Sequence, residues 1–220
     1  TRSIFKESHH PTQKEFISFL RHQSLHIDIL CLQEVSSFYL QSHLTDQQLH
    51  SFGHFMFPDT SFVVSKHCVI IFLNPYLIID GASISLDQRI VSCSIYDPSS
   101  TLVTDITTVY VPANAADRPS FISSFMSMPF VSSMSSRPFL LTGDFNMPLH
   151  SSSNNSIPYA TPLVEWISIH FNNCFPDGKS TFTRGDYRST IDYLYAHISM
   201  STRITNGKVH YVPSSWTDHC

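Results

Sequence analysis

The chain has 220 residues, of which 42% are hydrophobic and 14% are charged, and this composition excludes an intrinsically disordered protein. Its length suits one domain that is large enough to bury a two-layer core. The formal net charge of −4 with neutral histidines excludes the strongly basic surface of a tight non-specific nucleic-acid binder, so any contact with DNA has to come from local basic residues.

The cysteines indicate where the protein works. All five are scattered, none forms a Cys-x-x-Cys pair, and three lie inside the apolar runs "DILCLQ", "HCVIIF" and "IVSCSI". Buried free thiols fit this pattern better than disulfides or a zinc site, and free thiols are typical of a reducing compartment. No apolar run approaches the roughly 18 residues that span a bilayer. We therefore expect an intracellular, soluble protein.

The first predicted elements are a helix and a strand. In "PTQKEFISFLRHQSL", Thr12 and Glu15 form a capping box, in which the two side chains satisfy free backbone donors at a helix start. The apolar residues that follow share one face. The run "HIDILCLQEV" is too short for a helix of its own and predicts a strand that is buried on both faces. This strand ends in the polar residues Gln33 and Glu34.

Residues 61–111 predict several strands in series, because short β-rich runs alternate with turn residues such as Asp80-Gly81. Short turns between successive strands favour an antiparallel sheet. Further along, we predict a helix from Asp117 to Met126, a buried strand in "PFLLTGDFN" and a second helix from Leu163 to Phe171. Strands broken by two or three helices predict a β-sandwich with the helices packed outside.

Polar residues stand at the exits of several predicted strands. Strands of stacked sheets tend to finish at the same edge, so we expect these side chains to converge. Carboxylates, an amide and one imidazole suit a hard divalent cation and phosphate chemistry, because Mg²⁺ favours oxygen ligands, whereas zinc favours nitrogen and sulfur. The residues concerned are Glu34, Asp144, Asn146, Asp192, Asp218 and His219.

Each of these residues also has an ordinary structural explanation. Asp144 suits a turn, Asp192 suits an ion pair with Arg184 or Arg188, and Asp218 suits the cap of a turn. Taken one at a time, these explanations are the stronger ones. The order of the motifs along the chain favours a shared site.

That order carries a family resemblance. Leu-Gln-Glu, Tyr-x-Pro, Gly-Asp-Phe-Asn, Ile-Asp-Tyr and Asp-His follow one another over nearly the whole chain, and this succession resembles the endonuclease/exonuclease/phosphatase superfamily with its DNase I-like fold. "VYVPANAADRPSFISSF", "GDFNMPL" and "KSTFTRGDYRSTIDYLYAH" are similar to segments of the apurinic-type endonuclease domain of LINE-type non-LTR retrotransposons. The resemblance implies an α+β fold, a four-layer α/β-sandwich of two mainly antiparallel sheets flanked by helices.

The resemblance also implies a metal-dependent phosphodiester hydrolysis with five catalytic side chains. Asp144 would orient and deprotonate the attacking water, and Asn146 would position that water or a phosphate oxygen. His219 would bind the scissile phosphate, with Asp192 hydrogen-bonded to its far nitrogen. Tyr110 would donate its hydroxyl to the same phosphate. Together they supply a positioned water and a neutralised oxyanion.

Metal and partners follow from the same resemblance. Glu34 would be the principal metal carboxylate, and Asp218 would complete or support the site for Mg²⁺, with Mn²⁺ as a substitute. DNA would be the partner, with Arg184, Tyr187 and Arg188 meeting a base or the minor groove. The resemblance further implies action in the nucleus and a reverse transcriptase domain on the same full-length polypeptide.

The chain departs from the family at both ends. The family's first strand, with its metal-linked Asn, and the strand that follows Asp-His have no counterpart here, so we expect residues 1–220 to be a single domain of this superfamily that lacks its first and last strands. Three other functions stay open within the fold. They are a phosphatase or phosphodiesterase acting on a phosphoinositide or lipid head group, which the acidic net charge favours, an apurinic repair nuclease, and an inactive remnant.

Overall fold

The computed structural model describes residues 27–35, 60–133, 137–150, 157–175, 179–205, 207–212 and 217–219, together with separate positions between 11 and 22. Thr12 of the predicted capping box lies outside these residues, whereas Glu15 is described and is helical. In the part of the chain that is described, no helix is long and apolar enough to cross a membrane.

A three-stranded antiparallel sheet forms one layer of the molecule. Its central strand, with the sequence CVIIF, is buried along its whole length, as a strand covered on both faces has to be. The predicted strand before Glu34 is present, but the prediction that it is buried on both faces is wrong, because it lies at the edge of this sheet and all but one of its residues are only half-buried. The spatial order is β1-β3-β2, with β1 at Ile29–Gln33, β2 at Ser61–Val64 and β3 at Cys68–Phe72.

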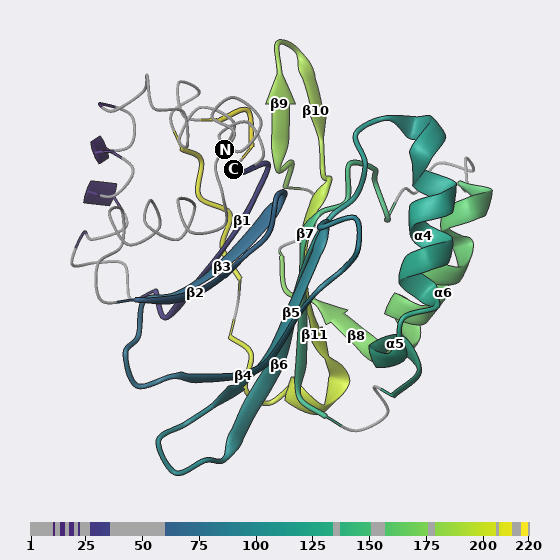
Figure 1. The fold of residues 1–220 in the computed structure, drawn as a ribbon. Helices are drawn as coiled ribbons and strands as arrows, with labels where there is room; N and C mark the ends of the chain where they lie inside the picture. Colours follow the sequence, from purple (N-terminus) through teal and green to yellow (C-terminus); the bar gives the residue numbers. More distant parts are fainter. Residues whose placement is uncertain are drawn as a thin grey trace.

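A six-stranded sheet forms the second layer and faces the first (Figure 1). Its neighbouring strands are antiparallel except for one parallel pair, β6 and β7. The spatial order is β4-β5-β6-β7-β11-β8, with β4 at Ile78–Ile84, β5 at Ile90–Tyr96, β6 at Leu102–Tyr110, β7 at Phe139–Asp144, β11 at Asp192–His197 and β8 at Phe171–Asn173.

The predicted turn at Asp80-Gly81 is wrong. β4 runs through both residues, and its register with β5 shifts between Asp80 and Ser83. Gly81 has a φ of 60°, which fits a bulge inside a strand as well as a turn between strands. A glycine after an aspartate therefore kinks the strand here and does not end it.

Helices cover the outer face of the six-stranded sheet (Figure 1). The two helices that were predicted in the second half of the chain are present as α4 and α6, and Phe171 opens β8 directly after α6. Among the described residues, a short helix, α5, and three 3₁₀ turns were not predicted. Their bounds are η2 Ala115–Asp117, α4 Arg118–Met126, α5 Pro129–Ser133, η3 Pro158–Ala160, α6 Thr161–His170 and η4 Ile198–Met200.

Two apolar cores hold these layers together. One lies between the sheets and includes Ile70, Val91 and Ile106. The other lies between the six-stranded sheet and its helices and includes Leu141 and Leu163. Alternate residues of the same strands enter the two cores, as the two-residue period of a strand requires. The six-stranded sheet is therefore fixed from both sides, which makes its strand ends a rigid support.

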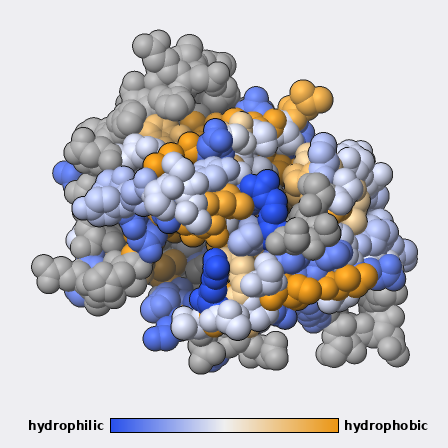
Figure 2. All heavy atoms as spheres, turned by 90° about the horizontal axis from the view of Figure 1, so that it is seen from below, coloured by the Kyte–Doolittle hydropathy of each residue, from blue (hydrophilic) through white to orange (hydrophobic). Residues whose placement is uncertain are grey.

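A separate hairpin joins β9, Phe182–Arg184, to β10, Tyr187–Ser189. Its two-residue turn begins at Gly185 with a φ of 59°, as hairpin turns with glycine first require. Figure 1 shows the hairpin projecting from one end of the molecule. At the opposite end, hydrophobic side chains reach the surface between hydrophilic ones (Figure 2).

Candidate active site

Three of the predicted site residues occupy the ends of neighbouring strands in the six-stranded sheet. Tyr110, the last residue of β6, is in register with Asp144, the last residue of β7. Asp144 is in turn in register with Asp192, the first residue of β11. The parallel strands β6 and β7 finish together, and the antiparallel strand β11 begins beside them. The register of the sheet therefore brings these residues to one edge, called the catalytic edge below.

Gly143 allows β6 and β7 to approach closely at the catalytic edge. It is in register with Val109 and has a φ of 149°. A Cβ at this position would collide with the backbone of Val109, which cannot move without separating the two strands. Only glycine fits such a close approach. The glycine of the Gly-Asp-Phe-Asn motif thereby sets the spacing between Tyr110 and Asp144.

The turn after β7 fixes the carboxylate of Asp144. The backbone N–H of Asn146 donates to Oδ1 of Asp144 at 2.7 Å, and the Asn146 side-chain amide donates to Oδ2 at 3.2 Å. The same amide donates to the backbone oxygen of Val111 at 2.8 Å, which ties it to the chain after β6. Asn146 has a φ of 52°, and asparagine is among the residues that accept this left-handed conformation. One residue thus holds both carboxylate oxygens of Asp144.

His219 joins the catalytic edge from the far end of the described chain. A single antiparallel bridge pairs it with Phe182. Its Nδ1 lies 3.0 and 2.9 Å from the two carboxylate oxygens of Asp192, and its Nε2 lies 3.9 Å from Oδ2 of Asp144. Asp192 therefore pairs with the imidazole and not with either arginine of the hairpin.

Burial and charge shift the pKa values of Asp144 and His219. Burial raises the pKa of Asp144 to about 7, the charges of Asp192 and Glu34 act in the same direction, and His219 opposes them. Burial lowers the pKa of His219, but the hydrogen bond and charge of Asp192 and the charge of Asp144 outweigh it, so that this pKa is raised overall. Groups with pKa values near the working pH are suited to proton transfer.

Glu34 reaches the catalytic edge from the other sheet. It follows β1, which contacts β6 and β7, and the hydroxyl of Tyr110 donates to Oε1 of Glu34 at 3.0 Å. Glu34 is only 8% exposed and has a φ of 59°, a conformation that costs a residue with a side chain roughly 1–2 kcal/mol. Strained backbone of this kind clusters at functional sites.

Asp218 lies apart from Glu34. Its Oδ2 is 3.9 Å from Nε of Arg184, its side chain is 40% exposed, and its backbone oxygen accepts from the N–H of Thr183 at 2.9 Å. Within the described residues, the contacts of Asp218 do not include Glu34. The structure brings Glu34 to the catalytic edge and leaves Asp218 on the exposed margin beside the hairpin.

The side chains of the catalytic edge suit a hard divalent cation. Ligand atoms of Asp144, Asp192 and His219 lie within 4.8 Å of one another, and the charge of Glu34 contributes to the raised pKa of Asp144. Carboxylates that repel one another in a largely buried space are stabilised by a bound cation, and oxygen donors are the ones that Mg²⁺ prefers. Glu34 does not belong to this group of three, but the hydroxyl of Tyr110 connects it to the same edge.

The hairpin carries the predicted DNA-binding residues next to His219. Tyr187 is 62% exposed, the Arg184 side chain is 73% exposed, and Arg188 is exposed as well. Ring contacts lead from Tyr187 through Phe182 to His219, with centroids 6.3 and 5.2 Å apart. A ligand held against the hairpin would therefore lie close to the catalytic edge.

Thr181 is a supporting residue that the sequence did not predict. Its hydroxyl oxygen accepts from the backbone N–H groups of Ile191 and Asp192 at 3.1 and 2.9 Å, and the residue is 2% exposed. It fixes the start of β11 from eleven residues earlier in the chain. No spacing rule links a threonine to an acid at this distance, so only the fold reveals the contact.

Tyr193 is a second supporting residue without a sequence signal of its own. Its hydroxyl accepts from the backbone N–H of Leu149 at 2.8 Å and donates to the backbone oxygen of Thr190 at 2.9 Å. The phenol therefore joins the loop after Asp144 to the segment before Asp192. In the sequence, only its position directly after Asp192 in the Ile-Asp-Tyr motif connects Tyr193 with the candidate site.

No known protein family matches the sequence, and no curated protein matches it. Solved structures do match. The endonuclease domain of TRAS1, a telomere-specific non-LTR retrotransposon, aligns with a TM-score of 0.65 and 14% identity over 99% of this chain and 91% of that chain. TDP2 of D. rerio, complexed with single-strand DNA product, aligns with a TM-score of 0.56 and 10% identity over 84% of this chain and 76% of that chain.

The catalytic domain of human Nocturnin, with a bound sulfate anion, aligns with a TM-score of 0.53 and 13% identity over 94% of this chain and 83% of that chain. This chain has the DNase I-like fold. The DNase I-like fold that the order of motifs implied is confirmed, and so is the α+β class with two mainly antiparallel sheets flanked by helices. At such low identities the likeness establishes the fold, and the activity has to be argued from the catalytic edge.

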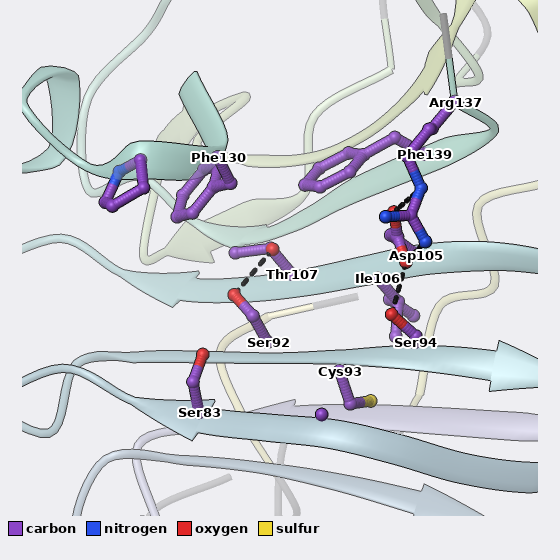
Figure 3. Close-up of a pocket in the computed structure, with 12 residues that line it drawn as sticks. Ser83, Ser92, Cys93, Ser94, Asp105, Ile106, Thr107, Phe130, Arg137 and Phe139 are labelled. Carbon is purple, nitrogen blue, oxygen red and sulfur yellow. Dashed lines mark hydrogen bonds and ion pairs between the residues drawn. The ribbon is translucent and has the colours of Figure 1, made fainter. Parts of the chain in front are cut away.

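A pocket of this structure lies away from the catalytic edge. This pocket, of about 300 Å³, opens on the helix side of the six-stranded sheet, and its polar groups pair with one another (Figure 3). Asp105 binds Arg137 at 3.1 Å and Ser94 at 2.6 Å, and Ser92 bonds Thr107 at 2.7 Å. It is lined by Gly81, Ser83, Ser92, Cys93, Ser94, Asp105, Ile106, Thr107, Pro129, Phe130, Arg137 and Phe139.

Proposed function

We propose that the chain is a Mg²⁺-dependent DNA endonuclease that nicks target DNA for a LINE-type retroelement. The observation that carries the proposal is the convergence of Asp144, His219 and Glu34 at one edge of a rigid sheet. The same fold is found in the endonuclease domain of a telomere-specific non-LTR retrotransposon. Shared fold alone does not assign an activity, and the proposed activity depends on the chemistry that each of these side chains can perform.

Asp144 is the proposed general base. Its pKa of about 7 lets it hold a proton part of the time at neutral pH and take one from water when it is ionised. The attacking water would sit between Asp144 and the amide of Asn146, whose position is fixed by its bond to Val111. The water oxygen attacks phosphorus, its proton passes to Asp144, and the bond from phosphorus to the leaving oxygen breaks.

His219 and Tyr110 are the proposed phosphate-binding groups. The Asp192 carboxylate engages Nδ1 of His219 and keeps the imidazole protonated, which leaves the Nε2 side for a phosphate oxygen. Tyr110 projects its hydroxyl beside Glu34 at the same edge. Donors that are fixed before substrate binds lower the barrier because they do not have to reorganise as charge grows on the phosphate.

Glu34 is the proposed principal metal carboxylate. A bound Mg²⁺ would supply positive charge to a phosphate oxygen, and Mn²⁺ would be able to replace it. Asp218 is proposed to support this site, which requires that its carboxylate leave Arg184, 3.9 Å away. Because that contact is exposed, the exchange costs little.

DNA is the proposed partner, and the hairpin is the proposed contact. A net charge of −4 makes general attraction to DNA weak, so affinity would come from Arg184 and Arg188, with Tyr187 between them stacking on a base or entering the minor groove. The complex of D. rerio TDP2 with a DNA product supports a nucleic-acid substrate for this fold. Action in the nucleus and a reverse transcriptase domain on the same full-length polypeptide belong to the same proposal.

The acidic net charge favours one alternative, a phosphatase or phosphodiesterase acting on a phosphoinositide or lipid head group. Such a substrate is small and needs no basic surface. The catalytic edge would perform the same hydrolysis, and the exposed hairpin arginines would then have no ligand.

Conversion of supercoiled plasmid to the nicked circle tests the proposal. We expect nicking that requires Mg²⁺, stops with a chelator, and is lost in Asp144→Asn and His219→Gln. His170→Ala is a matched control, because His170 lies on α6 on the far side of the sheet. Turnover of a phosphoinositide without nicking would establish the alternative, and no turnover of either substrate by a folded protein would indicate an inactive remnant.

A further inference from the structure

The phenol ring of Tyr110 rests against two residues that the proposed mechanism does not use. The ring of His67 is stacked on it, with centroids 5.6 Å apart and an angle of 24° between the planes. The guanidinium carbon of Arg89 lies 5.1 Å from the centroid of the same ring. His67 directly precedes β3 and Arg89 directly precedes β5, so two turns meet at this phenol.

These two turns are tied together, which fixes His67. The hydroxyl of Ser65 accepts from the backbone N–H of His67 at 3.3 Å and reaches the backbone oxygen of Gln88 at 2.8 Å. The side chain of Gln88 accepts from the backbone N–H of Lys66 at 3.1 Å. The backbone oxygen of His67 also lies 3.5 Å from the N–H of Val35, the residue after Glu34. The imidazole is therefore held between the segments that carry Glu34 and Tyr110.

Hydrogen bonding within the described residues does not account for an imidazole at position 67. Its Nδ1 is buried and has no hydrogen-bond partner among them, a loss that costs about 1–3 kcal/mol. Burial, together with the charges of Arg89 and Lys66, lowers the pKa of His67 to about 4. The ring is therefore neutral near pH 7, and what it offers to Tyr110 is a flat, uncharged face.

The phenol that His67 contacts is central to the catalytic edge. Tyr110 is 7% exposed, its backbone N–H donates to the oxygen of Arg89 at 2.9 Å, and its hydroxyl donates to Glu34 at 3.0 Å. The backbone is thus fixed by the sheet, but the direction of the hydroxyl depends on the rotation of the side chain. A stacked ring limits that rotation.

We propose that His67 is a positioning residue of the catalytic edge, whose ring clamps the phenol of Tyr110 so that its hydroxyl, which donates to Glu34 in this structure, stays in place to donate to the substrate phosphate. The inference rests on the proposed function, because it gives His67 a part in the same phosphodiester hydrolysis. The missing hydrogen bond at Nδ1 of His67 lowers the stability of the fold, and in this proposal the flat ring that stacks on Tyr110 is the reason that a histidine stands there. Loss of the clamp would slow the chemical step and leave substrate binding nearly unchanged.

A double-mutant cycle tests this clamp. We expect His67→Ala to lower kcat roughly tenfold with little change in KM, because a small displacement of a catalytic group is enough for such a loss. His67→Phe keeps a flat ring without nitrogen and should restore most of kcat. In a Tyr110→Phe background, His67→Ala should have no further effect, since the hydroxyl that it positions is gone. An equal loss in both backgrounds, or no rescue by phenylalanine, would overturn the proposal.

A second measurement does not depend on activity. In a ¹³C-tyrosine NMR spectrum, the Tyr110 signal is identified by its loss in Tyr110→Phe. We expect it to shift and broaden in His67→Ala, to stay near its place in His67→Phe, and to be unaffected in His170→Ala. If the wild-type chain cleaves DNA but the Tyr110 signal does not change in His67→Ala, the clamp is refuted and the proposed function stands. A chain that cleaves nothing while the signal responds supports the clamp and refutes the proposed function.

Discussion

Asp144 and Asp105 are acids of the same sheet with opposite surroundings. Asp105 is one of the β6 residues that line the pocket, and it is paired with Arg137 and with the hydroxyl of Ser94. Asp144 ends β7, is 2% exposed, and has Asp192 and Glu34 as charged neighbours. The first acid is neutralised by the fold. The second is held with excess negative charge, and only a proton, an imidazole or a cation can relieve it.

The difference teaches how to distinguish a structural acid from a reactive one. A partly exposed ion pair such as Asp105 with Arg137 contributes at most about 1 kcal/mol to stability. A buried carboxylate among other carboxylates costs stability at neutral pH, because its raised pKa means that the folded chain resists ionisation. The fold keeps Asp144 at this position although its burial lowers stability at neutral pH, and such a destabilising group is expected where function needs it.

Replacing Asp144 should change the rate of cleavage more than any other substitution that compares the two acids. Asp144→Asn keeps the shape of the side chain and removes the base, so we expect cleavage to fall by about 10²–10⁴-fold. Asp105→Asn, the matched change in the pocket, should leave the rate within about twofold, since it touches no group of the catalytic edge. Initial rates of plasmid nicking measure both. Equal losses in the two variants would remove the distinction between the acids.

The same substitution should increase stability in a pH-dependent way. The pKa of Asp144 is raised from an ordinary 3.8 to about 7, so between these values the folded wild-type chain binds a proton that the unfolded chain does not. Its stability therefore falls as pH rises through this window. Asp144→Asn should be more stable than wild type by roughly 1–3 kcal/mol at pH 8 and nearly equal to it at pH 4. Urea unfolding at both values measures the difference, and a variant that is less stable at pH 8 would contradict the burial argument.

Asp192→Asn should move the pH profile of the reaction. Hydrogen bonding and charge from Asp192 are the main influences that raise the pKa of His219, and the protonated imidazole is the active form in the proposed mechanism. The alkaline limb of kcat against pH should therefore shift to lower pH, with a loss of roughly tenfold or more near pH 8. If the alkaline limb of the kcat–pH profile does not shift, Asp192 only packs against the imidazole of His219 and does not set its protonation.

Tyr193→Phe should have a smaller effect that reports on support for Asp144. Removal of the hydroxyl breaks its bonds to Leu149 and Thr190, and we expect a loss of about 1–3 kcal/mol in the free energy of unfolding. Activity should fall several-fold, since the loop after Asp144 and the start of β11 lose their link. Full activity together with full stability would show that the two segments hold their places without the phenol.

The smallest effect is expected from Arg137→Gln. The variant removes the cation that neutralises Asp105 on the helix side of the sheet, and we expect a change of about 0–1 kcal/mol in stability and none in nicking. Thermal unfolding and the plasmid assay are sufficient. A large loss of activity would connect the pocket to the catalytic edge and end the contrast between the two acids.

The fold class could be predicted because the motifs occur in a characteristic order along the chain, and most of the candidate site residues could be predicted because each stands at the end of a recognisable strand. Asp144 and Asp192 end or begin strands whose apolar runs are visible without a structure. The turn at Asp80-Gly81 was wrong because a bulge and a turn share the same residue types. Thr181, Tyr193 and His67 were missed because their contacts join segments far apart in the chain. Such tertiary contacts leave no period or spacing in the sequence.

Gly143 has a consequence for any set of diverged copies of this sequence. Because a Cβ at this point would collide with the backbone of Val109, a single methyl group would push apart the two strands whose tips carry the proposed general base and the proposed phosphate-binding phenol. A gene copy can therefore keep every acid, amide and imidazole and still be silenced by the smallest possible side chain. Surveys that score such copies as intact by their polar residues alone will overcount the working ones.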